Sequence, residues 1–309
     1  MQLEKKDIGK LIDFNFRKLE ALQNPAPAKI LTPWESVLEE ANRPDGISFP
    51  DSWNLKGITM RPSLLTILGA YSGIGKSTTM LNIIRHLFVK GKKALVFSHE
   101  MTPGQLWARF AGIDMSMEGR GSHTIYEIFE FAKKQDDYLK SLIEEASKYI
   151  TVIDSTGWTA GQITAEFENY ILENDEPDMV AIDYLQIIRP DMESVPKDKR
   201  LQVMSIMEEL TGYAKKTSSV WLVVAQTNRD AAKREDGKAP SLTAFQESAA
   251  IEQNAGLAIT LGRAVSDGDT LSNTMNIRIA KNRFGRTGAS DVNLDPVTGA
   301  IEPPLRGLE

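Results

Sequence analysis

Apolar residues along the chain gather in short runs that are separated by segments of helical periodicity. Seven runs have the length and composition of buried strands, at 63–68, 94–97, 150–153, 179–182, 221–225, 257–261 and 275–280. Between most of the early runs, apolar residues recur every three to four positions, as they do in amphipathic helices. This alternation predicts an α/β fold with a mostly parallel central sheet and helices on both faces.

The two ends of the chain depart from this pattern. Near the start, one face of a predicted helix carries Ile8, Leu11, Ile12, Phe16 and Leu19, and N-P-A-P-A at 24–28 ends that helix. We expect a second short helix at 34–41, a helical arm over 1–45 and one domain over 46–309. The arm could pack on its own domain or on a neighbouring subunit. After the last predicted helix, D-P-V-T-G at 295–299 predicts a β-hairpin over 291–302 that closes the sheet.

Composition narrows the class of protein. The 309 residues are 41% hydrophobic and 25% charged with a net charge of −6, which is typical of a globular domain and not of a nucleic-acid coat protein. The chain has no cysteine, which excludes disulfides, a thiol nucleophile and a cysteine-based zinc site. The charged start and the lack of a long apolar run predict no secretory signal and no membrane span. We therefore expect a cytoplasmic protein.

The first predicted strand and the helix after it enclose a phosphate-binding sequence. Residues 66–79 read T-I-L-G-A-Y-S-G-I-G-K-S-T-T. In such a loop, backbone N–H groups surround the β-phosphate, the lysine (Lys76) reaches the β- and γ-phosphates, and the hydroxyl (Ser77) ligates Mg²⁺. Ala70 stands where the motif has glycine, and Gly69 comes one residue early. We expect the nucleotide to contact Ala70, Ser72, Gly73, Gly75, Lys76, Ser77 and Thr78.

Three strand ends supply the other groups that phosphoryl chemistry needs. The strand M-V-A-I-D ends in Asp183, which could order Mg²⁺. The strand A-L-V-F-S-H-E ends in Glu100, which could orient and deprotonate water, because ligands of open α/β sheets bind outside the carboxyl ends of strands. His99 is the competing candidate for the base, but side chains alternate along a strand, so His99 should point away from the side that Glu100 faces. The strand W-L-V-V-A-Q ends in Gln226, whose amide could sense the γ-phosphate. Alternatively, each is an ordinary polar residue at a strand end.

Together these segments resemble the motor domain of the hexameric replicative helicases, the bacterial DnaB type and the primase–helicases of short-tailed phages. The shared segments are A-Y-S-G-I-G-K-S-T at 70–78, F-S-H-E-M at 97–101, I-D-Y-L-Q at 182–186, V-A-Q-T-N-R at 224–229, E-S-A-A-I-E-Q-N-A at 247–255 and K-N-R-F-G-R-T-G at 281–288. The resemblance implies a RecA-like P-loop NTPase core, a ring of subunits and ATP at each subunit boundary. It also implies that Lys281 and Arg283 reach into the site of the next subunit, although both could be solvated charges on an edge strand.

The resemblance further implies that two channel-facing loops bind single-stranded DNA through phosphates, without reading bases. The first, 189–200, follows the strand of Asp183, and the second, from 229 to about 250, follows the strand of Gln226. The expected contacts are Lys197, Lys199, Arg200, Arg229, Lys233, Arg234, Glu247 and Ser248. These residues could instead belong to ordinary charged loops. The family's L-R-E-S-G element reads F-Q-E-S-A here, so Gln246 replaces its arginine and Ala249 its glycine. A phosphate contact at position 246 is therefore weakened.

The sequence thus predicts an ATP-dependent replicative DNA helicase that uses ATP and Mg²⁺ and translocates on single-stranded DNA as a homohexamer. A 5′-to-3′ polarity is suggested by the resemblance alone. A RecA-type recombinase and a non-motor replication accessory protein that switches on ATP binding are the alternatives, and the segments at 247–255 and 281–283 favour the helicase. We see no counterpart of the DnaB N-terminal domain or of a primase, so we expect a separate primase and loader, and a phage or plasmid origin is plausible.

Overall fold

The computed structural model describes residues 31–190, 198–227, 238–242, 245, 248–266 and 270–303. The chain divides into two compact units, Met1–Pro44 and Asp45–Glu309. In the first unit, the helix predicted at 34–41 is α2 (Pro33–Ala41). Thr32 and Glu35 start it with a capping box, in which each side chain accepts a hydrogen bond from the backbone N–H of the other. The helix predicted around residues 8–19 lies outside the described residues.

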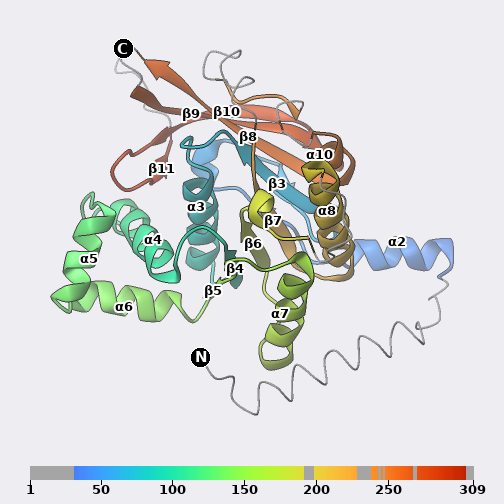
Figure 1. Cartoon of the computed structure of the whole chain (residues 1–309), viewed down its shortest axis with the longest axis horizontal. Helices are drawn as coiled ribbons and strands as arrows, with labels where there is room; N and C mark the ends of the chain where they lie inside the picture. The colour runs from blue at the N-terminus through green and yellow to red at the C-terminus, as the bar shows by residue number, and fades with distance from the viewer. Residues whose placement is uncertain are drawn as a thin grey trace. The chain divides into compact units, whose positions relative to one another are not determined.

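The second unit is built on a nine-stranded sheet with the strand order β11-β10-β9-β8-β3-β7-β6-β4-β5 (Figure 1). The strands are β3 (Leu65–Ala70), β4 (Ala94–Ser98), β5 (Ile150–Asp154), β6 (Met179–Asp183), β7 (Val220–Gln226), β8 (Ala255–Ser266), β9 (Thr270–Asn282), β10 (Gly288–Leu294) and β11 (Ile301–Glu302). The strands from β5 to β8 in this order run parallel, and β8 to β11 are joined by antiparallel pairs. The predicted mostly parallel sheet and its closing hairpin are confirmed.

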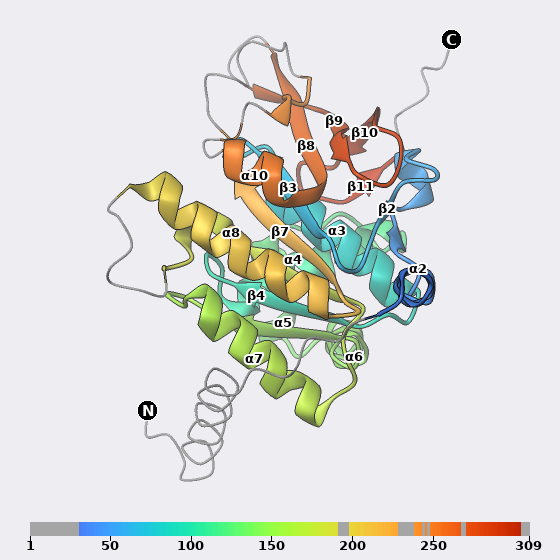
Figure 2. The same cartoon turned by 90° about the vertical axis from the view of Figure 1, so that its right-hand side faces the viewer.

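Helices cover both faces of the sheet. They are α3 (Lys76–Val89), α4 (Pro103–Met117), α5 (Ile125–Lys133), α6 (Asp137–Ala146), α7 (Ala160–Glu173), α8 (Lys199–Lys216) and α10 (Ser248–Asn254). Successive side chains of β3 point to opposite faces of the sheet. Leu68 packs in the core under α3 and α4, whereas Ile67 packs in the core under α7, α8 and α10. Figure 2 shows α7 and α8 together on one side of the strands and α3 on the other.

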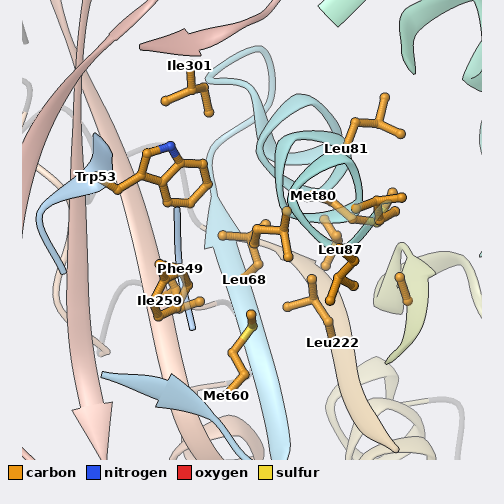
Figure 3. Packing of buried hydrophobic residues seen from close by; sticks show 14 of the residues in the cluster. Phe49, Trp53, Met60, Leu68, Met80, Leu81, Leu87, Leu222, Ile259 and Ile301 are labelled. Carbon is orange, nitrogen blue, oxygen red and sulfur yellow. The ribbon is translucent and has the colours of Figure 1, made fainter. Parts of the chain in front are cut away.

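The core under α3 fixes the position of that helix. Figure 3 shows Leu68 of β3 and Leu222 of β7 next to α3, with Ile259 of β8 farther from the helix, beside Phe49. Trp53, which is fully buried, belongs to the same core. It lies in a short 3-10 helix, η1 (Asp51–Trp53), between the paired strands β1 (Ile47–Ser48) and β2 (Thr59–Met60), a hairpin that the sequence did not predict. Burying each large aliphatic side chain here contributes about 1.5–3 kcal/mol to the stability of the folded domain.

The segment between β4 and β5 folds as three helices with a small core of their own. Ala111 of α4, Ile128 of α5 and Leu142 of α6 belong to that separate cluster. Figure 1 shows α5 and α6 at the periphery, beyond α4. The sequence predicted helix here but not the number of helices. Among the described residues, no helix combines the length and the apolar character that crossing a bilayer requires.

Candidate nucleotide-binding site

The phosphate loop connects the end of β3 to the start of α3. Two of its residues have left-handed backbone conformations, Gly73 with φ 83° and Gly75 with φ 117°. Glycine adopts such angles without the steric cost that a side chain would add. Ala70 is the last residue of β3 and has extended backbone, so alanine is tolerated where the motif has glycine. Ser72 lies exposed in the loop, and Lys76, Ser77 and Thr78 form the first turn of α3.

Lys76 lies among the negative groups of the site. Its ammonium donates a hydrogen bond to the Tyr71 carbonyl, with 3.2 Å between the nitrogen and the oxygen. Burial lowers the pKa of Lys76 from its usual value, and the charges of Asp183 and Glu100 oppose that shift. A lysine that is drawn back onto its own loop, next to two carboxylates, is suited to pair with an incoming phosphate.

Asp183 ends β6 and is only 1% exposed. Among the described residues, neither of its carboxylate oxygens has a hydrogen-bond partner of ordinary geometry. Burial raises the pKa of Asp183 to about 6, although Ser77 and the charge of Lys76 favour the ionised form. A buried carboxylate without a partner is costly, and a cation would remove that cost.

These residues fit Mg²⁺ held jointly with a nucleotide. In the described part of the chain, no group of three or more acidic or histidine side chains is arranged as a complete metal site. Mg²⁺ commonly keeps several waters and binds one or two protein groups together with substrate phosphates. Asp183 and Ser77 are the protein groups that would complete such a shell.

Glu100 follows β4 and projects into solvent beside Asp183. The His99 backbone N–H donates to the Asp183 carbonyl at 2.8 Å, which ties the end of β4 to the end of β6. His99 itself is 5% exposed, and burial lowers the pKa of its ring, whereas Glu100 is exposed. The two side chains therefore differ in exposure, which agrees with the opposite orientation that alternation predicts. The role of Glu100 as the base stays a prediction.

Gln226 lies level with the start of the phosphate loop, because it pairs with Ala70 in the register of β3 and β7. Its backbone is held by Gln186, whose amide oxygen accepts from the Gln226 N–H at 3.0 Å and whose amide nitrogen donates to the Gln226 carbonyl at 3.1 Å. Sequence reasoning missed Gln186 as a supporting residue. The signal that could have found it is its place at the end of I-D-Y-L-Q, next to the strand of Asp183.

A second residue that sequence reasoning missed is Asn82, in α3. Its side chain, 2% exposed, donates to the Thr78 and Gly299 carbonyls at 2.8 and 2.9 Å, and it accepts from the Ile301 N–H at 2.9 Å. Gly299 has φ 80°, and a Cβ there would collide with the Thr78 methyl group. The turn between β10 and β11 is thus fixed directly against the first turn of α3.

Lys281 and Arg283 lie away from the phosphate loop of their own chain. In the register of the sheet, Lys281 pairs with Ala258 of β8, which is level with Ile67 of β3, and Arg283 comes after the end of β9. Arg283 is therefore near the amino end of β3, whereas the loop follows its carboxyl end. The Arg283 backbone N–H donates to Gly256 at 2.9 Å, and its guanidinium donates to the Gln253 carbonyl.

The structure describes only some of the expected DNA-contact residues, and their contact with DNA stays a prediction. Lys199 and Arg200 are the exposed first residues of α8, where the Asp198 side chain accepts from the Arg200 N–H at 2.9 Å. Ser248 is the first residue of α10. The other expected contacts, and Gln246, lie outside the described residues: Lys197, Arg229, Lys233, Arg234 and Glu247.

The fold and the site define a class of protein, the P-loop nucleotide-binding proteins with a RecA-like core. The sequence model of the DnaB-like helicase C terminal domain matches residues 54–300. The chain therefore belongs to that family.

Curated relatives and solved structures agree with this assignment. The replicative DNA helicase DnaB of Buchnera aphidicola subsp. Baizongia pistaciae is 26% identical over 286 residues, 92% of this chain and 58% of the relative. The DnaB of Haemophilus influenzae is 26% identical over 232 residues, 74% of this chain and 49% of the relative. The chain spans about half the length of the curated relatives it matches.

Two solved structures share the fold. One is a DnaB-like replicative helicase described with its interactions with primase, which superimposes with a TM-score of 0.73 at 21% identity over 97% of this chain and 75% of that chain. The other is an ATPase domain, with a TM-score of 0.71 at 23% identity over 87% of this chain and 96% of that chain. At these identities the likeness establishes the fold and no more.

Proposed function

We propose that the chain is the motor of an ATP-dependent replicative DNA helicase that moves along single-stranded DNA as a ring, with ATP hydrolysed at subunit boundaries. Its relatives are named replicative DNA helicases, and its family is the helicase C terminal domain. The single observation that carries the proposal is that the expected site residues lie at opposite ends of the strands of one sheet. Lys76, Asp183 and Gln226 lie at the carboxyl ends of the parallel strands. Arg283 lies near the amino end of β3.

That separation favours a site shared between subunits. Strands rise about 3.3 Å per residue, so the four residue steps from Thr66 to Ala70 alone separate the two ends of the strand by roughly 13 Å. Asn282 is level with Thr66, and Arg283 comes one residue later, two strands to the side. Arg283 can therefore contribute to a phosphate site only on another copy of the chain. A cation supplied in this way stabilises transition-state charge and makes hydrolysis depend on subunit arrangement.

Within the shared site, each residue has a separate task. The loop N–H groups and Lys76 bind the phosphates, and Ser77 and Asp183 would hold Mg²⁺, which when bound neutralises charge on the phosphate oxygens. Glu100 orients the attacking water and accepts its proton. Gln226 contacts the terminal phosphate and responds to its loss. The same proposal includes a hexameric ring, a separate primase and loader, and a cytoplasmic location.

Strand displacement on a forked duplex tests the function. The full chain, with ATP and Mg²⁺, should release the labelled strand, and single-stranded DNA should stimulate its ATP hydrolysis. Lys76→Ala should do neither. Release of strands only through pairing with a homologous duplex would identify a recombinase instead. ATP binding with hydrolysis that DNA does not stimulate would identify a non-motor switch, and either result would overturn the proposal.

A further inference from the structure

The glycine that comes one residue early in the phosphate-loop motif has a packing explanation. Gly69 lies inside β3, paired with Ala225 and Thr260, so its backbone is extended and does not require glycine for conformational reasons. A Cβ at this position would instead overlap Cε1 and Cζ of Phe245. Glycine is therefore present because the Phe245 ring occupies the space of a side chain.

Phe245 reaches that position from the segment between β7 and α10. Its side chain is 2% exposed and lies in the core under α7 and α8. Its backbone forms an antiparallel bridge with Thr227, directly after Gln226. The Thr227 N–H in turn donates to the Ala70 carbonyl at 3.0 Å. One residue thus packs its ring on the strand that leads to the phosphate loop and pairs its backbone beside Gln226.

We propose that Phe245 is a positioning residue that couples the nucleotide site to the segment following β7, where the sequence places the expected DNA contacts from Arg229 to Ser248. This inference rests on the proposed function. Interiors are close-packed, and the ring has no free space on the side of Gly69. A shift of Gly69 and Ala70 as the phosphates change must displace the ring, and displacement of the ring by the DNA-binding segment must likewise act on the loop.

The first test replaces the ring without changing polarity. Phe245→Leu should leave ATP hydrolysis without DNA, and the KM for ATP, within about twofold of wild type, and it should lower the stimulation by single-stranded DNA about three- to thirty-fold. Phe167→Leu is the matched control, because Phe167 of α7 is 1% exposed in the same core and packs on Trp221. The control should lose similar stability but keep full stimulation.

The second test exploits the shape of the contact. Gly69→Ala alone should lower DNA-stimulated hydrolysis, because its methyl group overlaps the ring, and combining it with Phe245→Leu should restore activity above that of Gly69→Ala. If Phe245→Leu does not fold, Phe245→Met replaces it in the same measurements. Unchanged stimulation in the Phe245 variants, an equal loss in Phe167→Leu, or no recovery in the double variant would each overturn the inference. Wild-type protein that DNA fails to stimulate would overturn the proposed function, and the coupling with it.

Discussion

The side-chain amide of Gln186 binds the backbone of Gln226 at both its donor and its acceptor, at 3.0 and 3.1 Å. Strand β6 pairs with β7 only as far as Ile182 and Val223, so the last residues of β7 have no strand neighbour on that side. Gln186, in the 3-10 helix η2 (Leu185–Ile187), supplies the two hydrogen bonds that a strand would have made. The position of the proposed γ-phosphate sensor therefore depends on a side chain 40 residues away in sequence.

Replacing Gln186 by alanine should impair turnover more than binding. Losing the amide leaves the Gln226 N–H and carbonyl unpaired, which costs about 1–3 kcal/mol and loosens the sensor, so we expect kcat to fall about tenfold with the KM for ATP within about twofold. Steady-state ATP hydrolysis measures both constants. Gln162→Ala is the matched control, because that amide accepts from the Thr159 N–H at 2.9 Å in the cap of α7.

A double variant separates positioning from a merely structural role. If Gln186 acts through Gln226, then Gln186→Ala combined with Gln226→Ala should be no slower than Gln226→Ala alone, because neighbours that act as one unit are not additive. Effects that multiply would show that the two residues act independently.

The raised pKa of Asp183 predicts a pH dependence of stability. Burial brings the pKa to about 6 in the folded chain from 3.8 in the unfolded chain, so the folded state holds the proton more tightly. The resulting stabilisation is complete below about pH 4 and is lost as the pH rises through 6. Asp183→Asn should therefore raise the free energy of unfolding at pH 8 without Mg²⁺, by on the order of 3 kcal/mol, and change it little at pH 4.

Thermal denaturation without and with Mg²⁺-ATP measures this effect. Mg²⁺-ATP should stabilise the wild type more at pH 8 than at pH 5, because the cation requires the ionised carboxylate, and should stabilise Asp183→Asn less. Asp178→Asn is the control, since Asp178 pairs with Lys92 at 2.8 Å and should not gain stability at pH 8. An Asp183→Asn protein less stable than wild type at pH 8 without Mg²⁺ would contradict the argument.

The sequence alone could predict those parts of the site whose positions follow from the local pattern of apolar and polar residues. Asp183, Glu100 and Gln226 each end an apolar run, and parallel strands bring such ends to one edge, so their common location could be predicted. For Ala70 the sequence left a condition open, because alanine fits there only where φ is negative. The structure meets it, since the left-handed positions of the loop are Gly73 and Gly75.

Long-range partners could not be read from the sequence. Asn82 bonds Gly299 across 217 residues, and nothing in either local segment identifies the other. Gly69 looked like a displaced motif glycine, and only the position of Phe245 shows why it is there. The hairpin β1–β2 was missed because its strands are two residues each, too short for a period-two pattern to be visible.

Asn82 should support nucleotide binding through the first turn of α3. Asn82→Ala would leave the Gly299 carbonyl and the Ile301 N–H without the partner they have now, at a cost of roughly 1–3 kcal/mol in stability. With Thr78 less firmly held, we expect the KM for ATP to rise about three- to tenfold with little change in kcat. Asn169→Ala is the control, because the Asn169 amide bonds Glu166 within its own helix. A fall in kcat at constant KM would assign Asn82 a different role.

Glu100→Gln should separate binding from chemistry. The amide keeps the size of the side chain but cannot accept the proton of the attacking water, so we expect turnover to fall at least about 100-fold while ATP binding is retained. Fluorescent ATP-analogue binding and ATP hydrolysis measure the two properties. Asp154→Asn is the control, because Asp154 ends the edge strand β5 level with Ser98. Near-normal turnover in Glu100→Gln would mean that another residue is the base.

Mixing two inactive variants tests whether Arg283 acts on the neighbouring subunit. Arg283→Ala retains its phosphate loop, and Lys76→Ala retains its arginine, so each ring made of one variant should be inactive. In an equal random mixture, about one boundary in four joins an intact loop to an intact arginine, and hydrolysis should return to roughly a quarter of wild type. Arg286→Ala is the control: Arg286 lies in the same segment between β9 and β10, where its guanidinium donates to the Lys56 carbonyl, and the proposal gives it no role at the boundary. Its rings should therefore remain active alone. If the mixture of Arg283→Ala and Lys76→Ala stays inactive after subunit exchange is verified, Arg283 does not act across the boundary.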